Sequence, residues 1–579
     1  MTKLLKTVIS LLLLTSLLLS VLPAQATEVV NLRPYFEGVE TVETRQVPLY
    51  IESAEERTQV ELLYLNGVED IPYISVETAA LLLRETAAAV DYAGYEITLE
   101  KADSMAFFSR ENSALAWFDF GENVITFNDP DLFARHPGAV SSLDVVEPMG
   151  ANEAGEVTLF RATSISYRGG SALSYDLGAY NIFTFWQDGT GYFPLQTFSD
   201  VFLSQFPLFA LSNGNWVMIA SGLTEELTQL CAQTEAHEKS EELACFNYYE
   251  LCLALDHTYG LMEEHQIDSF LSFFAKTSLV NKLLTREAGD TYAALTDLTC
   301  GHFADSHSAP RYKSFWASEG TGEGDPALMT PMFSMLLAQL PFINARNAQY
   351  PEGVPGYEEV EDTAYITFDH FTLDYHRDYY STEITATTAD TLELLIYANA
   401  QIKRENSPIR NVVLDLSLNG GGSVPAAMFT VSWFLGSSSF NLVNVKTGAQ
   451  ANVSYQFDTN LDHMIGEEDV LSDMFGSLHL YCLIGPTSFS CGNLVPAAFK
   501  TSGSVTLIGR TSGGGACSVC VLSTADGNVF QLSSSMRANT VKNGIFYSVD
   551  EGVTPDIYID KIEHLYDRDY LTQLIHELD

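Results

Sequence analysis

The fold is decided by a short stretch at residues 482–500, CLIGPTSFSCGNLVPAAFK. The stretch begins inside an apolar run, LHLYCLIG, whose length and composition predict a buried strand. Small and hydroxylic residues follow, and a helix is predicted to begin near Cys491. The stretch is therefore a predicted strand–turn–helix unit with Ser490 at the start of the helix.

A second unit of this kind precedes it at residues 411–423, NVVLDLSLNGGGS. Here a predicted buried strand leads through three glycines, 420–422, into a helix. Further strand-like and helix-like runs alternate from about residue 360 onward, for example TAYITFDHF, ADTLELLIYANAQIKRE and VTLIG. This alternation predicts an α/β fold, with a largely parallel sheet that helices cover.

The N-terminal half has a different pattern. Short aromatic and β-branched runs broken by Gly, Asn and Asp predict mainly β structure up to about residue 225. A weak repeat links residues 63–83 with 184–203, since each has a strand, a polar turn, a Pro-bearing segment and an apolar helix. Helical spacing of apolar residues follows, and then Gly- and Pro-bearing loops reach to about 360. We expect four folded parts: α+β modules at 27–137 and 138–225, a helical subdomain at 226–310, and an α/β core at 311–579.

The composition limits the classes of partner. The chain has 75 Asp and Glu against 29 Lys and Arg, a formal net charge of −46, and is 46% hydrophobic. Such a chain is globular, and its acidic surface repels nucleic acids and anionic membranes. Neither is expected as a partner.

The first 26 residues have the layout of a secretory signal peptide. Lys3 and Lys6 precede a leucine-rich run, which ends at a small-x-small pattern, Ala24-Gln25-Ala26. We expect export with cleavage after Ala26. The alternative, a retained membrane anchor, is less consistent with an apolar run of only about 15 residues. The mature chain is therefore expected to be secreted and not inserted in a membrane.

Eight cysteines in 579 residues do not form a disulfide-dense framework. Cys517 and Cys520 form a single CxxC pair, and zinc sites usually need a second pair. A disulfide and free thiols both remain open for these two residues. His302, Asp305 and His307 lack the i,i+4 spacing of a helical metal motif, so no metal or organic cofactor is expected.

Ser490 has two possible roles. A serine at a helix start usually caps the helix, but the same position suits a nucleophile, because the helix dipole favours negative charge there. Parallel units also bring Ser490 and the glycine loop to the same edge of the sheet, where clefts form. A nucleophilic serine needs a base, and residues 295–310, LTDLTCGHFADSHSAP, supply His302 and His307.

Taken together, these segments resemble the C-terminal-processing (tail-specific) serine peptidase family. The segment VVLDLSLNGGG is similar to the family's Asp-Leu-Arg-x-Asn-Gly-Gly-Gly pattern, and LTCGHFADSHSAP is similar to its Asp-Gly-His-Thr segment. The run from Thr487 into TSGGGA resembles the nucleophile helix and its Gly-rich loop, and EGVTPD at 551–556 resembles a terminal Gly-Val-x-Pro-Asp. The resemblance covers roughly 240–579 and implies a core of crotonase/Clp-like β-α-β units.

The resemblance also implies roles for single residues. Ser490 would be the nucleophile, the amides of Cys491 and Gly421 the oxyanion hole, and His302 the general base. The late carboxylate that orients the base would be Asp550 or Glu551.

One departure separates the chain from the family's Ser–Lys branch. A lysine follows the nucleophile by 25 residues in that branch, whereas this chain has Gly515 there. The chain is therefore more similar to the tricorn-type branch, in which a histidine is the base. No PDZ-like insert is visible before TAYITFDHF, which leaves substrate selection to another part, for example the N-terminal modules.

The repeated N-terminal segments are weakly similar to modules of copper-amine-oxidase N-terminal-like domains. That similarity implies a binding or spacer role without copper chemistry. The sequence as a whole predicts an exported serine endopeptidase that acts on polypeptides. The alternative is a non-catalytic extracellular binding or scaffold protein on a peptidase-like fold, and the oligomeric state stays open.

Overall fold

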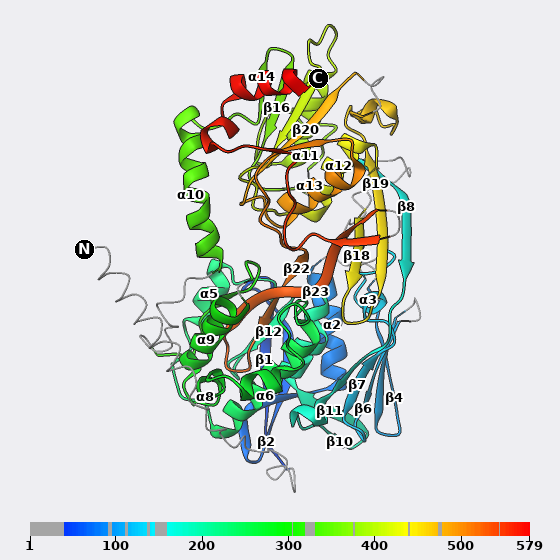
Figure 1. Cartoon of the computed structure of the whole chain (residues 1–579). Coiled ribbons are helices and arrows are strands. Elements are labelled where there is room, and N and C mark those ends of the chain that lie inside the picture. The colour runs from blue at the N-terminus through cyan, green and yellow to red at the C-terminus, as the bar shows by residue number, and fades with distance from the viewer. Residues whose placement is uncertain are drawn as a thin grey trace, which may run out of the picture.

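The computed structural model describes residues 40–90, 95–110, 114–135, 139–144, 159–303, 305–318, 331–374, 377–437, 440–472, 477–542 and 545–578. The predicted signal peptide, residues 1–26, lies outside the described residues. Within the part that is described, no helix has both the length and the hydropathy to span a membrane. The α/β core and the N-terminal sheets occupy opposite ends of the molecule (Figure 1).

The core is a six-stranded sheet with the order β15-β16-β17-β20-β21-β25. All neighbouring strands from β16 to β25 pair in parallel, as the strand–helix alternation predicts. The α/β fold class is therefore confirmed. The strands are β15 (Tyr357–Val360), β16 (Thr363–Thr367), β17 (Asn411–Asp415), β20 (His479–Ile484), β21 (Thr506–Gly509) and β25 (Ile557–Tyr558).

Helices cover both faces of the core sheet, because its strands alternate their apolar side chains between two clusters. Val412 and Leu414 pack on one face against helices α11–α13, whereas Val413 packs on the other face against α10 and α14. The helices are α10 (Pro331–Gln349), α11 (Thr391–Ile402), α12 (Val424–Leu435), α13 (Cys491–Ser502) and α14 (Arg568–Leu578), with short turns η5 (Glu467–Asp469) and η6 (Ile562–Leu565). Helix α10 falls where loops were predicted, in a segment interrupted by Pro341.

A second, antiparallel sheet has the order β14-β23-β18-β19-β8, and β22 and β24 also pair with β23. Its edge strand β8 comes from the region predicted as the second N-terminal module, yet it pairs along β19 of the core. The strands are β8 (Phe160–Arg168), β14 (Ala309–Tyr312), β18 (Phe440–Asn444), β19 (Gln450–Phe457), β22 (Cys517–Ser523), β23 (Val529–Lys542) and β24 (Ile545–Ser548).

The two N-terminal repeats lie side by side in one sheet, not in two separate modules. Each repeat is a hairpin followed by a helix, and β3 of the first pairs with β11 of the second in the order β10-β11-β3-β2-β1-β13-β12. These elements are β1 (Thr41–Ile51), β2 (Glu56–Leu65), β3 (Val68–Ser75), α2 (Val76–Ala89), β10 (Phe185–Gln187), β11 (Thr190–Pro194), α4 (Leu195–Val201), β12 (Phe209–Ser212) and β13 (Val217–Ala220).

Between the repeats the chain forms a five-stranded antiparallel sheet with the order β4-β5-β6-β7-β9. Its elements are β4 (Thr98–Ala102), β5 (Met105–Ser109), β6 (Leu115–Asp119), β7 (Val124–Phe127), α3 (Pro130–Phe133), β9 (Leu173–Asp176) and η2 (Leu177–Tyr180), and η3 (Leu203–Gln205) follows α4. The short helix α3 and the turn η3 both reach the second core sheet, as described below.

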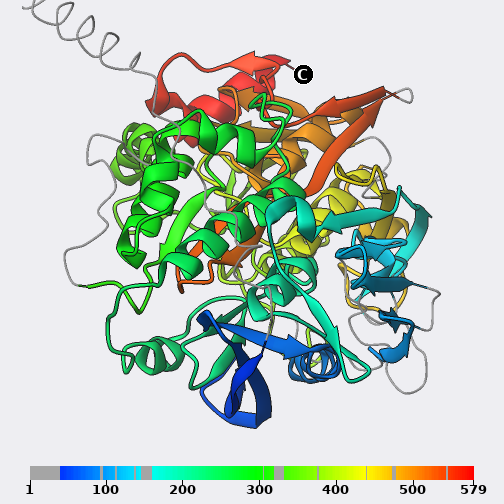
Figure 2. The same ribbon diagram turned by 90° about the horizontal axis from the view of Figure 1, so that it is seen from below.

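The predicted helical subdomain is present as α5 (Glu225–Cys231), α6 (Glu241–Thr258), α7 (Phe270–Ala275), α8 (Leu279–Leu283) and α9 (Ala288–Asp297). A π-helical turn, η4 (Leu298–Phe303), ends it and carries His302. Seen from below, this helical layer packs beside the core and the N-terminal strands (Figure 2). The buried ion pair between Lys239, just before α6, and Asp526, 2.7 Å long, joins this layer to the turn between β22 and β23.

Candidate active site

The loops that follow β17 and β20 meet at the carboxyl edge of the core sheet. The Thr487 hydroxyl donates a hydrogen bond to the Ser417 carbonyl at 2.6 Å. The Phe489 backbone N–H donates to the Asn419 carbonyl at 3.0 Å. These bonds place the serine-bearing loop on the glycine loop, in the arrangement that two successive parallel units predict.

Ser490 stands at the cap position of α13 but does not act as a cap. Its φ of 55° and ψ of −122° are unusual for a residue other than glycine, and its side chain makes no capping hydrogen bond. The backbone is held from both sides, because Ser490 N–H donates to the Gly514 carbonyl at 2.9 Å and its carbonyl accepts from Leu494 N–H at 2.8 Å. A strained backbone of this kind, which costs about 1–3 kcal/mol, is typical of functional sites.

Gly421 packs directly against this serine. A Cβ atom at Gly421 would lie 2.7 Å from Ser490 Cβ, and its φ of +105° also favours glycine. The Gly421 N–H, which the sequence assigns to the oxyanion hole, donates to Asn419 Oδ1 at 2.9 Å. By contrast, no described residue accepts a hydrogen bond from the N–H of Gly422 or of Cys491. Both amides are therefore free to bind an anion.

His307 is the histidine that packs on the serine loop. Its ring centroid lies 4.5 Å from that of Phe489, the residue before Ser490. A Cβ atom at Gly515 would lie 3.1 Å from His307 Cε1 and 2.6 Å from Phe489 Cε2. The imidazole and the phenyl ring therefore occupy the space that a side chain at position 515 would need, where the Ser–Lys branch has its lysine.

A short turn holds the backbone of His307. Its N–H donates to Asp305 Oδ1 at 3.0 Å, and the Ser308 hydroxyl donates to Asp305 Oδ2 at 2.6 Å. The His307 carbonyl accepts from Gln531 Nε2 on β23 at 2.6 Å. The histidine is thus positioned by the Asp305 turn and by β23 of the second core sheet.

The His307 ring is buried, with 6% of the residue exposed, and burial lowers its pKa. The carboxylates of Asp305 and Asp550 act in the opposite direction. Its Nδ1 is buried and has no hydrogen-bond partner among the described residues. A neutral imidazole with one unsatisfied ring nitrogen is suited to accept a proton.

Of the two carboxylates that the sequence offers as orienters, Asp550 is near His307 and Glu551 is exposed. Asp550 Oδ1 accepts from Ala516 N–H at 2.9 Å, and its carbonyl accepts from Gly515 N–H at 3.2 Å. These bonds tie Asp550 to the Gly-rich loop beside Ser490 and His307.

His302, the base favoured by the sequence, lies in a different environment. It is exposed on η4, and its ring packs edge-on against Phe273 of α7 at 5.2 Å, with Asp297 nearby. The π-helical turn directs this side chain toward Phe273 of α7, whereas His307 lies past the turn, two residues before β14. The contacts therefore favour His307 over His302.

The sequence contained a signal for His307. Asp305-Ser306-His307-Ser308 aligns residue by residue with an Asp-Gly-His-Thr segment, since the histidine lies two residues after the aspartate and before a hydroxyl residue. The sequence prediction chose His302 instead, because a glycine precedes it. Asp305, which shapes the turn, was also not assigned a role.

A small pocket of about 50 Å³ opens beside Ser490. A pocket of this size holds a few water molecules or a small side chain. Its wall is largely apolar and includes Val424, Leu442, Leu494, Met536 and Ala538, together with Cys491 and Cys517.

All eight cysteines are free and buried, so the CxxC pair on β22 forms no disulfide. Burial raises the pKa of Cys491 to about 12, which leaves the thiol beside Ser490 protonated. No group of three or more His, Cys, Asp or Glu side chains in the described ranges is placed to hold a metal ion.

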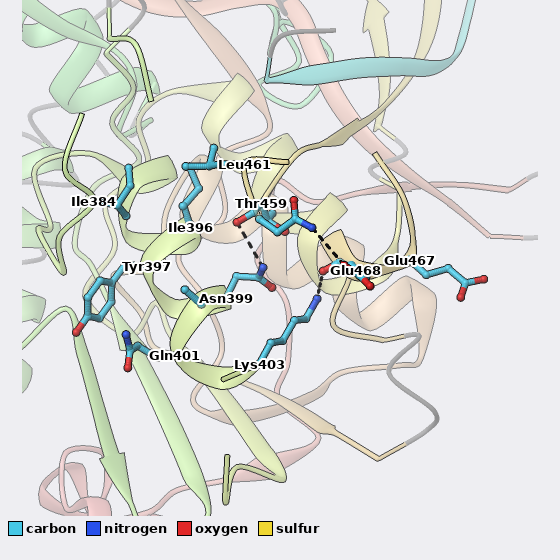
Figure 3. A pocket seen from close by; sticks show the side chains of 12 residues that line it. Ile384, Ile396, Tyr397, Asn399, Gln401, Lys403, Thr459, Leu461, Glu467 and Glu468 are labelled. Carbon is cyan, nitrogen blue, oxygen red and sulfur yellow. Dashed lines mark hydrogen bonds between the residues drawn. The ribbon is translucent and has the colours of Figure 1, made fainter. Parts of the chain in front are cut away.

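A larger cavity, of about 760 Å³, is lined by residues of α11 and of the segment 459–468 (Figure 3), and Ser490 is not part of its lining. Ile384, Ile396 and Leu461 form its apolar wall. Burial lowers the pKa of Lys403 to about 8, but its Nζ already donates to the carbonyls of Glu468 and Val470. The Thr459 hydroxyl in its lining donates to Asp469 Oδ1 at 3.1 Å, and both residues are buried.

Residues 362–559 match the model of a protein family described as Peptidase family S41. No curated protein matches the chain. Among solved structures, the chain is similar to a photosystem II D1 C-terminal processing protease, with 17% identity and a TM-score of 0.25 over 34% of this chain and 42% of that one. It thus spans less than half of that protease.

The chain is also similar to a putative peptidase from Parabacteroides merdae, with 14% identity and a TM-score of 0.40 over 58% of this chain and 97% of that one. The tricorn protease has 12% identity and a TM-score of 0.34 over 83% of this chain and 60% of the other.

Proposed function

We propose that the chain is an exported serine endopeptidase with Ser490 as nucleophile and His307 as general base, a proposal supported by the match of residues 362–559 to Peptidase family S41. The observation that carries the proposal is the conformation of Ser490. It occupies a cap position in a strained backbone, makes no capping bond, and follows the residue on which His307 packs.

The chemistry follows from this geometry. The neutral His307 imidazole takes the Ser490 hydroxyl proton as the oxygen attacks a peptide carbonyl, and it then delivers that proton to the leaving amine. The free N–H groups of Cys491 and Gly422 stabilise the oxyanion, an effect worth about 3 kcal/mol for each donor. Asp550 acts as a positioning residue, because its negative charge stabilises the imidazolium that forms.

Gly515 supports a histidine mechanism over a Ser–Lys mechanism. Its φ is +86°, and a Cβ at this position would lie only 2.6 Å from Phe489 Cε2, which leaves no room for a lysine. The His307 ring therefore borders the space in which the Ser–Lys branch has its lysine side chain.

The test is the Ser490→Ala variant. We expect it to lose hydrolysis of an unstructured protein such as casein, and to lose labelling by a fluorophosphonate, while its melting temperature stays close to that of the wild type. Wild-type activity in this variant would exclude Ser490 as the nucleophile. Asn281→Ala, a substitution in the helical subdomain, is a suitable control for activity that is lost during expression and purification.

A second candidate, a non-catalytic binding protein, is favoured by one observation. His307 Nδ1 has no hydrogen-bond partner among the described residues, so no carboxylate orients the ring through that nitrogen. This candidate predicts that the wild type is neither labelled nor active, and that Ser490→Ala binds polypeptides as tightly as the wild type.

Export is proposed from the N-terminal pattern of two lysines, a leucine-rich run and Ala24-Gln25-Ala26. Expression of the full chain in a secreting host, followed by N-terminal sequencing, tests it. We expect the mature protein outside the cytoplasm with Thr27 as its first residue, whereas an intact N-terminus in the cytoplasmic fraction would contradict export.

A further inference from the structure

A second cavity adjoins the Ser490 pocket and reaches the N-terminal half of the chain. It has a volume of about 240 Å³ and shares Ser518 and Met536 with the pocket beside Ser490. One wall is formed by β22 and β23, and the other by α3, the residues after it, η3 and the end of α6. We call this cavity the acidic pocket, because two carboxylates line it.

Two buried carboxylates line the acidic pocket. Asp131 on α3 is 5% exposed, and its carboxylate accepts from Asn444 Nδ2 at 3.2 Å and from the Ser142 hydroxyl at 3.1 Å. Asp144 is 2% exposed and accepts from the Tyr455 hydroxyl at 2.7 Å. The donors to Asp131, which also include the Thr447 hydroxyl at 3.5 Å, are neutral.

The cations around Asp131 do not neutralise it. None of the ion pairs between described residues includes Asp131, and, besides burial, the charge that acts on its pKa is the carboxylate of Asp129, which raises it further. Lys446, two residues after Asn444, donates instead to the Asp256 carbonyl at 2.8 Å. His257, which also lines the pocket, has its two ring nitrogens against backbone carbonyls, and burial lowers its pKa.

A buried carboxylate without a cation is unfavourable, and its cost is reduced when a ligand supplies the positive charge. Burial accordingly raises the pKa of Asp131 to about 6. A lysine or arginine side chain suits the site, because its apolar stem can lie along Met536 and Leu173 while its charged end reaches the carboxylates.

We propose that the acidic pocket is a substrate subsite, which binds a lysine or arginine side chain of a polypeptide whose scissile bond lies at Ser490. The inference rests on the proposed peptidase function and extends it to a class of substrate. It gives the N-terminal half a role, since α3 and the residues around Asp144 supply the charge while the core supplies the nucleophile.

The test uses the full-length protein and internally quenched peptides made of small neutral residues. One lysine is moved through successive positions on both sides of the cleaved bond, and each peptide is compared with its norleucine counterpart, which keeps the stem and lacks the charge. We expect one position at which lysine raises kcat/KM about tenfold, in the range of a charge-assisted hydrogen bond.

The Asp131→Asn variant should reduce this preference to less than twofold while it cleaves the norleucine peptide like the wild type. Glu122→Gln, an exposed carboxylate in the same N-terminal sheet, is the matched control and should keep the full preference. If Asp131→Asn melts at a markedly lower temperature, the lysine preference is tested with Asp144→Asn and Ser535→Trp instead. The first variant removes the other carboxylate charge, and the second fills the pocket. Both should bring the lysine peptide close to the norleucine value.

Two results would overturn the subsite: no position that prefers lysine, or a preference that survives all of these pocket variants. Fluorophosphonate labelling of Ser490 separates this failure from failure of the proposed function. If the wild type is labelled and cleaves peptides without a lysine preference, only the subsite is wrong. If the wild type is neither labelled nor active, both the peptidase proposal and the subsite proposal are wrong.

Discussion

Replacement of Gly515 by alanine would test the packing of His307 against Phe489, the residue before Ser490. A Cβ at this position would lie 2.6 Å from Phe489 Cε2 and 3.1 Å from His307 Cε1, whereas ordinary contact begins at 3.4 Å. The phenyl ring would therefore have to move by about 0.8 Å, and the imidazole by about 0.3 Å. Because Phe489 precedes Ser490, this movement displaces both partners of the proposed reaction.

The expected loss of activity can be set against the loss of stability. Misplacement of a catalytic group by about 1 Å can cost on the order of 10²-fold in rate. A non-glycine residue in the left-handed region costs about 1–3 kcal/mol of stability. Gly503→Ala is the matched control, since Gly503 has a φ of +74° and a Cβ there would have no atom within 4 Å.

The assay compares the two variants in kcat/KM on a quenched peptide and in melting temperature. We expect Gly515→Ala to lose about 10²-fold in kcat/KM and Gly503→Ala to stay within about threefold of the wild type, although both lose stability. If Gly515→Ala is as active as Gly503→Ala, the inferred packing of Phe489 and His307 around the serine is incorrect.

Two further predictions concern the carboxylates. Asp550→Asn should lower kcat by about 10²- to 10⁴-fold while Glu551→Gln stays within twofold, as measured on the same peptide, and the reverse order would assign the orienting role to Glu551. Burial raises the pKa of Glu250 to about 8, from about 4.3 in an unfolded chain. The folded state therefore binds this proton more tightly than the unfolded state does. The resulting stabilisation is complete below about pH 4 and is lost as the pH rises toward 8. In thermal melting from pH 5 to 9, the Tm of the wild type should fall with rising pH, and the Tm of Glu250→Gln should fall less steeply. Glu241→Gln, exposed on the same helix, should follow the wild type. Equal slopes of Tm against pH in all three proteins would contradict this prediction.

The core was predictable because its determinants are local. The apolar runs of β17 and β20 are each followed within a few residues by glycine or by small hydroxylic residues, and such patterns predict strand–turn–helix units without any knowledge of distant contacts. The position of Ser490 at the start of α13 followed from the same reasoning. What the sequence could not show was its backbone conformation, on which the proposed role of nucleophile rests.

The N-terminal arrangement depends on pairings between distant segments. Strand β1 pairs in parallel with β13, and β8 joins β19 of the core. Hydrophobic patterning marks such strands but does not select their partners, so the repeats were visible while their shared sheet was not. The acidic pocket likewise depends on residues brought together from Asp131 to Met536.

The choice between His302 and His307 depended on the path of the chain after α9. The two histidines are five positions apart, and a π-helical turn followed by the pairing of β14 with β23 points them to different parts of the molecule. Such turns have no strong local sequence signature. The Asp-x-His-Ser pattern at 305–308 was the available signal.

The assignment of His307 as the base for Ser490 is tested most directly by comparing His307→Ala with His302→Ala in single-turnover hydrolysis of a quenched peptide. We expect a loss of at least about 10³-fold for His307→Ala and activity within about twofold of the wild type for His302→Ala. Full activity in His307→Ala together with loss in His302→Ala would contradict the assignment.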